Sequence, residues 1–136
     1  MTVLVLDAEA LSLLARGGPR ERTVRSALTA ALTERADVVV PAAVLAELYR
    51  GGGHDQAVDA CLAREGGIEV APTDRFLARR MGHVLAAAAR GSAHRVDAAV
   101  VAVCAAAGGG VVLTGDPRNI ADLASGSPAI TVRSIR

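Results

Sequence analysis

Four acidic residues stand in otherwise apolar stretches and are the clearest candidates for chemistry in this chain. Asp7 follows VLVL, Glu47 lies in VPAAVLAEL, Asp97 precedes AAVVAV, and Asp116 follows VVLTG. A carboxylate in apolar surroundings needs a partner for its charge, or it takes up a proton. Four such groups brought together would form an all-oxygen site for a hard divalent cation such as Mg²⁺ or Mn²⁺.

Each acid also has an explanation that involves no chemistry. Asp7 can cap the helix expected after it, and Asp116, which precedes a proline, has the form of a helix N-cap. Asp97 can complement a helix dipole, and Glu47 can pair with Arg50. For any single acid the structural role is the more frequent one. The ordered set, with each acid in a suitable element, favours a shared site.

The elements that must position these acids follow from the hydrophobic pattern. Short β-branched runs alternate with longer segments rich in Ala, Leu and Arg, which predicts a single doubly wound α/β domain over residues 1–136. The runs lack polar alternation, as expected of a parallel sheet covered on both faces. We expect strands at Thr2–Leu6, Asp37–Val40, Ile68–Val70, Val111–Leu113 and Ile130–Val132. We expect helices at Ala8–Ala15, Arg20–Arg35, Ala42–Arg50, Gln56–Arg64, Thr73–Ala89 and Arg95–Ala107. The glycines at 51–53 are expected to stop a helix.

In such a sheet, ligands bind beyond the carboxyl ends of the strands, where the strand order reverses. Asp7 directly follows the first expected strand, and Asp116 lies three residues after the fourth. If those two strands are neighbours, both acids emerge at the same edge. Asp97 falls in the first turn of its helix, and Glu47 flanks an apolar stripe, so both helices can direct a carboxylate toward that edge.

Composition excludes several classes of function. All 15 basic residues are Arg, so a P-loop lysine and Schiff-base chemistry are excluded. The formal net charge of +1 gives no overall attraction to nucleic acid, so any such binding needs a local arginine patch. The three histidines lie far apart in the sequence, without metal-binding spacing or a nearby nucleophile.

The cysteine pattern and the start of the chain bear on its location. Cys61 and Cys104 lie in Ala-rich contexts without a CxxC motif, which is typical of reduced, buried thiols in a cytoplasmic protein. No secretory signal opens the sequence. The uncharged stretch Ala98–Leu113 is too short for a membrane span and is interrupted by glycines. We therefore expect a cytoplasmic protein without a membrane segment.

These residues resemble the PIN-domain family, in particular VapC-like toxins of toxin–antitoxin pairs. The matching blocks are VLVLDAEAL, VVVPAAVLAELYRG, VDAAVVAVCAAAGGGVVLTGDP and a final strand near AITVRSI, which together span almost the whole chain. The resemblance implies a three-layer α/β/α fold with a central, mainly parallel five-stranded sheet. It also implies that the metal-site acids, which are the catalytic residues, are Asp7, Glu47, Asp97 and Asp116.

Three further positions of the resemblance matter for the site. Thr114 matches a threonine that helps to orient the last acid. Glu9 replaces a frequent hydroxyl residue, which either adds a fifth acid or removes a substrate contact. Asn119 stands where many relatives carry an acid, which implies weaker support of the metal ligands. We further expect Arg50 and Arg95 to contact the substrate.

The activity implied by the resemblance is a divalent-metal-dependent endoribonuclease that hydrolyses RNA phosphodiester bonds with Mg²⁺ or Mn²⁺. A toxin of this kind is expected to bind a small antitoxin protein and to form a homodimer. A non-catalytic PIN-fold module that binds RNA or an antitoxin is the alternative. Phosphotransfer enzymes and receiver domains also place aspartates at strand ends, but the D-x-D motif of the haloacid dehalogenases is absent, and both classes need a lysine.

Overall fold

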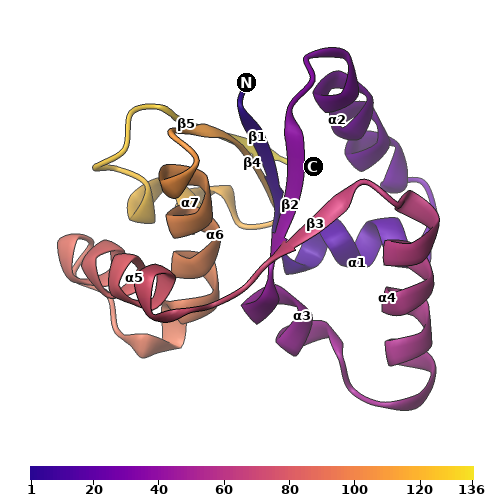
Figure 1. Ribbon diagram of the computed structural model, residues 1–136, viewed down its shortest axis with the longest axis horizontal. Helices are drawn as coiled ribbons and strands as arrows, with labels where there is room; N and C mark the ends of the chain where they lie inside the picture. The colour runs from indigo at the N-terminus through magenta and orange to yellow at the C-terminus, as the bar shows by residue number, and fades with distance from the viewer.

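A central sheet of five strands organises the molecule, which is described here over residues 1–136 by a computed structural model (Figure 1). The strands are β1 (Val3–Leu6), β2 (Asp37–Pro41), β3 (Ile68–Ala71), β4 (Gly110–Thr114) and β5 (Ile130–Ser134). Their order is β3-β2-β1-β4-β5, and every neighbouring pair is parallel. The expected five strands and parallel sheet are confirmed. Strand order reverses between β1 and β4, which are neighbours.

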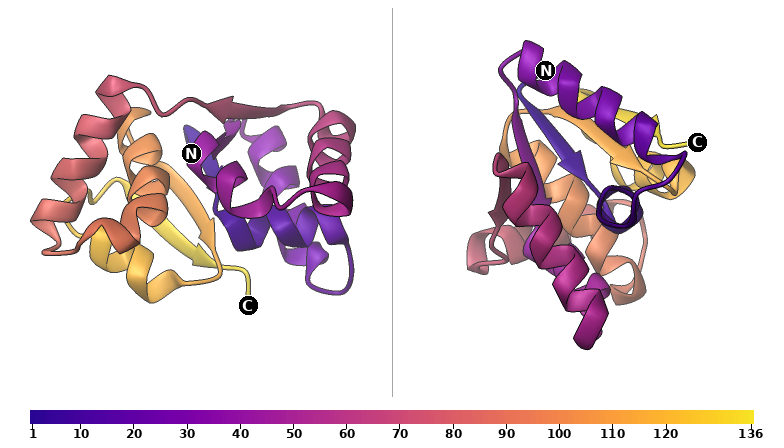
Figure 2. Two further views of the ribbon diagram at one scale, coloured as in Figure 1. Left: turned by 90° about the horizontal axis from the view of Figure 1, so that it is seen from below. Right: turned by 90° about the vertical axis from the view of Figure 1, so that its right-hand side faces the viewer.

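Helices cover both faces of this sheet and give three α/β/α layers, as predicted. They are α1 (Ala8–Arg16), α2 (Glu21–Thr33), α3 (Ala42–Leu48), α4 (Gly52–Glu65), α5 (Arg75–Ala87), α6 (Arg95–Ala106) and α7 (Pro117–Leu123), with a 3-10 turn η1 (Ser92–His94). Helices α5, α6 and α7 lie on one side, and α1, α2 and α4 on the other, as seen in Figure 1 and in the left view of Figure 2. Helix α6 packs directly on the sheet and carries α5 on its outer side.

Small aliphatic side chains build the core. All four residues of β1 are buried, as are the last four of β4 and the whole stretch 98–104 of α6. Ala and Val on α6 allow this helix to approach the sheet closely, because they leave few atoms between the two backbones. The only phenylalanine, Phe76, is 63% exposed on α5, so no aromatic ring from it fills the core. None of the helices has the length and apolar character needed to span a bilayer.

Two expectations from the sequence are wrong in detail. Helix α7 was not among the expected helices, because its seven residues give too short a pattern to recognise, although the N-cap form of Asp116 indicated a helix start there. The glycines at 51–53 do not simply end a helix, since α4 already begins at Gly52. The backbone N–H of Gly51 donates to Asp55 Oδ1 at 2.9 Å, which stabilises this start.

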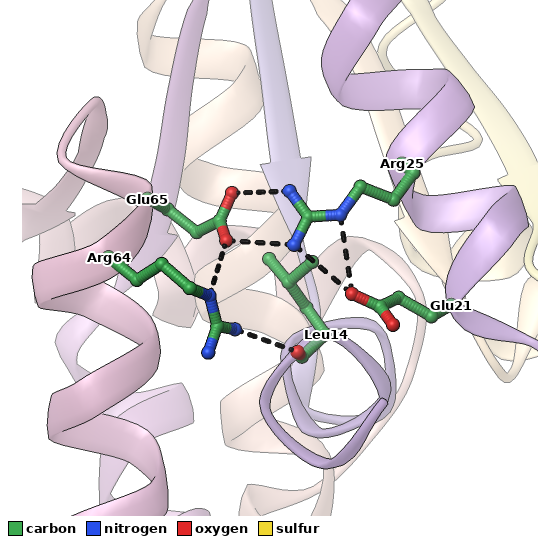
Figure 3. A network of polar contacts seen from close by, with 5 residues as sticks. All are labelled: Leu14, Glu21, Arg25, Arg64 and Glu65. Atoms are coloured by element: carbon green, nitrogen blue, oxygen red, sulfur yellow. Dashed lines mark hydrogen bonds and ion pairs between the residues drawn. The ribbon is translucent and has the colours of Figure 1, made fainter. Parts of the chain in front are cut away.

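An ion-pair network joins the helices on the α2 side of the sheet (Figure 3). Arg25 on α2 donates from Nη1 and Nη2 to the two carboxylate oxygens of Glu65 on α4, at 2.7 and 2.9 Å. Glu21 accepts from the same guanidinium, and Arg64 links Glu65 to the backbone oxygen of Leu14 on α1. The Arg25 hydrogen bonds lower the pKa of Glu65 despite its burial. The network therefore fixes three helices relative to one another.

We expect Glu65→Gln to lower the free energy of unfolding by about 1 kcal/mol at pH 7, because the pair is bidentate but Arg25 is 44% exposed to solvent. A carboxyl with a lowered folded-state pKa stabilises the fold above its unfolded pKa, about 4.3, and loses this contribution as the pH falls through the folded value. The difference from wild type should therefore shrink below about pH 4. Urea unfolding at pH 7 and pH 3 measures it. Glu34→Gln, at an exposed position without an ion pair, is the matched control, and an equal effect of both variants would contradict the prediction.

Candidate metal centre at the switch point of the sheet

Asp7 is held in place by the backbone of two neighbouring segments. It follows β1, and its Oδ1 accepts from Ala10 N at 2.9 Å, which caps α1. Its Oδ2 accepts from Gly115 N, just after β4, at 3.0 Å. Only 6% of the residue is exposed, and this burial raises the pKa of the carboxyl. Thr114 and the backbone N–H groups of Ala10 and Gly115 lower the pKa, whereas the charge of Glu9 raises it further. The cap foreseen from the sequence is present, but the second oxygen reaches across to β4.

Asp116 enters the same edge from the turn between β4 and α7. The hydroxyl of buried Thr114 accepts from Asp116 N at 2.9 Å and lies close enough to Asp7 to lower the pKa of that carboxyl. The carboxylate of Asp116 caps α7 through Asn119 N at 3.4 Å and is exposed. Thr114 thus lies next to both strand-end acids, and the orienting role expected of it stays a prediction.

Asp97 lies in the first turn of α6 and meets the other acids from one face of the sheet. Burial raises the pKa of its carboxyl; a hydrogen bond from Asn119 lowers it, and the negative charges of Asp7, Asp116 and Glu47 raise it further, in that order of size. All three other predicted acids are therefore close enough to influence this one carboxyl. This convergence is the central geometric feature of the site.

Glu47 approaches from α3, the short helix that follows β2. Helix α3 packs against both β2 and α6. The carboxylate of Glu47 is exposed. The pair with Arg50 considered from the sequence does not form. Arg50 instead donates to the backbone oxygens of Ala46 and Tyr49, both at 2.7 Å. Glu47 is thus left without an ion-pair partner near Asp97.

The four carboxylates share one edge, yet they do not form a closed set of metal ligands. No three side chains of the His, Cys, Asp and Glu types lie at metal-binding spacing. Mutual repulsion favours this separation, because uncompensated carboxylates at close range cannot all keep their charge. The prediction that the fold gathers the four acids at the switch point agrees with the structure; their role as ligands stays a prediction.

Asn119 is the residue at this site whose importance the sequence understated. Its Nδ2 donates to Asp97 Oδ2 at 2.6 Å, while its Oδ1 is buried and has no hydrogen-bond partner. The residue is only 8% exposed. A buried acceptor without a partner costs about 1–3 kcal/mol, so this edge of the fold is incomplete without a further donor or a cation. The sequence signal was the departure from an acid at this position.

Glu9 lies next to Asp7, and its charge raises the pKa of that carboxyl. Its Oε1 accepts from Arg136 Nη2 at 3.2 Å, and its carboxylate lies directly against the backbone of Gly115, in the space that a Cβ at that position would need. Sequence reasoning did not identify Gly115 or Arg136 as neighbours of this acid. Glu9 is thus both an ion-pair partner of Arg136 and a negative charge beside Asp7.

The remaining polar candidates contact protein atoms or lie elsewhere. Arg95 donates to Ser92 O at 3.0 Å, at the start of α6, so its expected contact with substrate stays a prediction. Cys61 and Cys104 are both free and buried, as expected. Burial raises the pKa of Cys104 to about 11, which makes its thiol unreactive at neutral pH.

The donor set fits a hard divalent cation. The candidate ligands at this edge are the carboxylate oxygens of Asp7, Glu47, Asp97 and Asp116, and the buried amide oxygen of Asn119 has no partner. Mg²⁺ and Mn²⁺ prefer such ligands, and a cation would relieve both the raised pKa of Asp97 and the unpaired acceptor. The residues present thus fit a hard divalent cation.

Comparison with known proteins gives the family. The sequence model of the PIN domain matches residues 4–125, and no curated protein matches by sequence. Among solved structures, the fold is similar to VapBC2 from Rickettsia felis bound to a promoter DNA fragment (TM-score 0.66, 12% identity, 98% of both chains). It is also similar to DNA-bound VapBC from Salmonella typhimurium (TM-score 0.66, 17% identity, 100% of both chains). A third is the sarcin-ricin loop cleaving toxin VapC20 of Mycobacterium tuberculosis (TM-score 0.55, 20% identity, 93% of this chain and 95% of that one). Because the family match covers most of its length, this chain belongs to the PIN domain family.

Proposed function

We propose that the chain is a divalent-metal-dependent endoribonuclease and the toxin of a toxin–antitoxin pair. The observation that carries the proposal is the carboxyl of Asp97, whose pKa is raised by burial and by the charges of Asp7, Asp116 and Glu47 at the switch point of the sheet. Membership of the PIN domain family supports nuclease activity. The similar fold of VapC20, described as a sarcin-ricin loop cleaving toxin, supports RNA as the substrate.

The chain's own residues would position the reaction without supplying a nucleophile. Asp7 is oriented by two backbone N–H groups, and Asp97 by the amide of Asn119. Thr114 accepts from the backbone N–H of Asp116 and lies next to Asp7. These carboxylates would hold Mg²⁺ or Mn²⁺, with Glu47 completing the set. A divalent cation held there neutralises the negative charge that develops on a phosphodiester during hydrolysis.

The proposed partners follow from the structures that resemble this fold. Two of them are VapBC assemblies bound to DNA, and a third is a toxin–antitoxin complex from Klebsiella pneumoniae (TM-score 0.66, 14% identity). We propose that this chain binds an antitoxin that covers the acid site. We also propose that it forms a homodimer and is located in the cytoplasm. Size-exclusion chromatography of the chain with and without a co-expressed antitoxin would measure both associations.

Cleavage of total cellular RNA by the purified chain, freed of any partner, tests the function. We expect discrete fragments with Mn²⁺ or Mg²⁺ and intact RNA with EDTA. We also expect Mn²⁺ to raise the Tm, because a ligand that binds only the folded state stabilises it. A chain that neither cuts RNA nor gains stability from Mn²⁺ would refute the proposal. The alternative, a non-catalytic PIN-fold module that binds RNA or an antitoxin, predicts binding of one of these without any metal-dependent fragments.

A further inference from the structure

A polar cavity of about 290 Å³ adjoins the acid cluster on the side of α7. Its lining comes from the segment after α5, from η1 and from α7 with the turn before it. The lining residues, which we name the arginine pocket, are Arg90, His94, Asp116, Arg118, Asn119 and Asp122. Two of them connect it to the candidate metal centre, because Asp116 is one of the four acids and Asn119 donates to Asp97. The two sites are therefore adjacent.

Two arginines and two aspartates line the arginine pocket, so its formal charges balance, but only one arginine is paired with a carboxylate. Arg90 Nη2 donates to Asp122 Oδ2 at 2.8 Å, so these two residues neutralise each other and fix the Arg90 side chain. Arg118 is exposed and forms no ion pair with any carboxylate of the chain. Its guanidinium is thus a positive charge without a carboxylate partner, next to Asp116, whose carboxylate would face the metal ion. His94 adds a further ring nitrogen to the same wall.

We propose that the arginine pocket binds a phosphate of single-stranded RNA next to the phosphodiester held at the four acids. This inference rests on the proposed nuclease function and names part of its substrate site. With a net charge of only +1, the chain has no general attraction for RNA, so a local cation must hold the strand. A guanidinium suits this role because its planar donors match two phosphate oxygens at once. Such a contact positions the strand without reading its sequence.

Arg118→Gln tests the pocket in a cleavage assay with Mn²⁺. We expect KM to rise about tenfold, since a hydrogen bond to a charged group is worth about 1.5 kcal/mol or more, while kcat changes little. The matched control is Arg22→Gln, which removes the same charge from an exposed arginine of α2 without an ion pair. Helix α2 lies on the opposite side of the sheet from α7 (Figure 1). The control should keep the wild-type KM; equal effects of both variants would overturn the proposal.

Binding without turnover separates the pocket from the nuclease function. In an Asp97→Asn background, fluorescence anisotropy with a labelled single-stranded RNA should show about tenfold weaker binding on adding Arg118→Gln. The slope of log affinity against log salt should fall by about 0.7, the value for one lost phosphate contact on a single strand. Arg22→Gln in the same background should change neither quantity.

The outcomes distinguish the two proposals. Arg118-dependent RNA binding without metal-dependent cleavage would support the pocket and refute the nuclease. Metal-dependent cleavage with an unchanged KM in Arg118→Gln would support the nuclease and overturn the pocket. A pocket that binds a Glu-rich peptide through Arg118 more tightly than RNA would belong to a protein partner, which also overturns the proposal.

Discussion

Replacing Asp97 by Asn is expected to lower the rate of RNA cleavage at least about 100-fold and to leave the fold intact. Losses of 10–100-fold follow the removal of groups that only support metal ligands, so losing a ligand should cost at least the upper part of that range. The amide keeps the shape of the carboxyl, and its oxygen can still accept from Asn119 Nδ2, as Asp97 Oδ2 does at 2.6 Å. The change therefore removes charge and preserves packing.

The same variant is expected to be more stable than the wild type without metal. Burial and the neighbouring acids raise the pKa of Asp97 above its ordinary value. A carboxyl with a raised folded-state pKa stabilises the fold below its unfolded pKa and loses that contribution as the pH rises through the folded value. At neutral pH the ionised Asp97 is thus unfavourable, and Asn removes this cost. We expect a higher Tm in EDTA and a smaller gain on adding Mn²⁺.

Three measurements together check this prediction: cleavage rate, Tm in EDTA at pH 5 and pH 8, and the Tm gain with Mn²⁺. The Tm difference between variant and wild type should be larger at pH 8 than at pH 5, because more of the Asp97 carboxyl is ionised at the higher pH. Asp37→Asn, at the exposed start of β2, makes the same chemical change away from the site and should leave all three unchanged. A variant as active as wild type would remove Asp97 from the proposed site.

Replacing Gly110 by Ala is expected to cost about 3 kcal/mol of unfolding free energy, the largest stability effect predicted here. Gly110 opens β4 with φ +157°, and a Cβ there would collide with the backbone oxygen and side chain of Val3 on β1. A strand backbone cannot yield as the tip of a flexible side chain can. Urea unfolding measures the loss, provided that the unfolding free energy of variant and wild type depends on urea concentration with the same slope.

Gly108→Ala is the matched control for this clash. Gly108 also has a positive φ, +87°, but no atom lies within 4 Å of a Cβ built there. We expect a loss of about 1 kcal/mol from backbone strain alone. Equal losses in the two variants would contradict the prediction, because they would show that the close approach of β1 does not exclude a side chain at position 110.

The contact at Gly110 also matters for the site, because it lies at the start of the strand pair that positions the acids. In the β1–β4 register, Leu6 is paired with Leu113, so Asp7 emerges beside Gly115 and accepts its N–H. Displacing β4 relative to β1 would break this hydrogen bond. We therefore expect the Tm gain with Mn²⁺ to fall in Gly110→Ala together with the stability.

The sequence by itself determined the elements and the approximate place of each acid. Uninterrupted β-branched runs separated by helical segments require parallel strands joined by helices on the two faces, and this pattern is local enough to recognise. Asp7 and Asp116 follow strands, while Glu47 and Asp97 lie on helices, as their positions relative to those runs indicated. The caps at Asp7 and Asp116 were equally visible, since capping depends on neighbours along the chain.

Only the tertiary structure decided how these parts meet. The order β3-β2-β1-β4-β5 depends on packing between distant segments, and it is this order that brings Asp7 beside Gly115 and Thr114. The bond from Asn119 to Asp97 and the pairing of Glu9 with Arg136 join residues 22 and 127 positions apart. No periodicity reports side-chain directions over such separations, because they are selected by the space and charge that the folded neighbours leave. The acids were thus identifiable from the chain, but the partners that orient them were set by the fold.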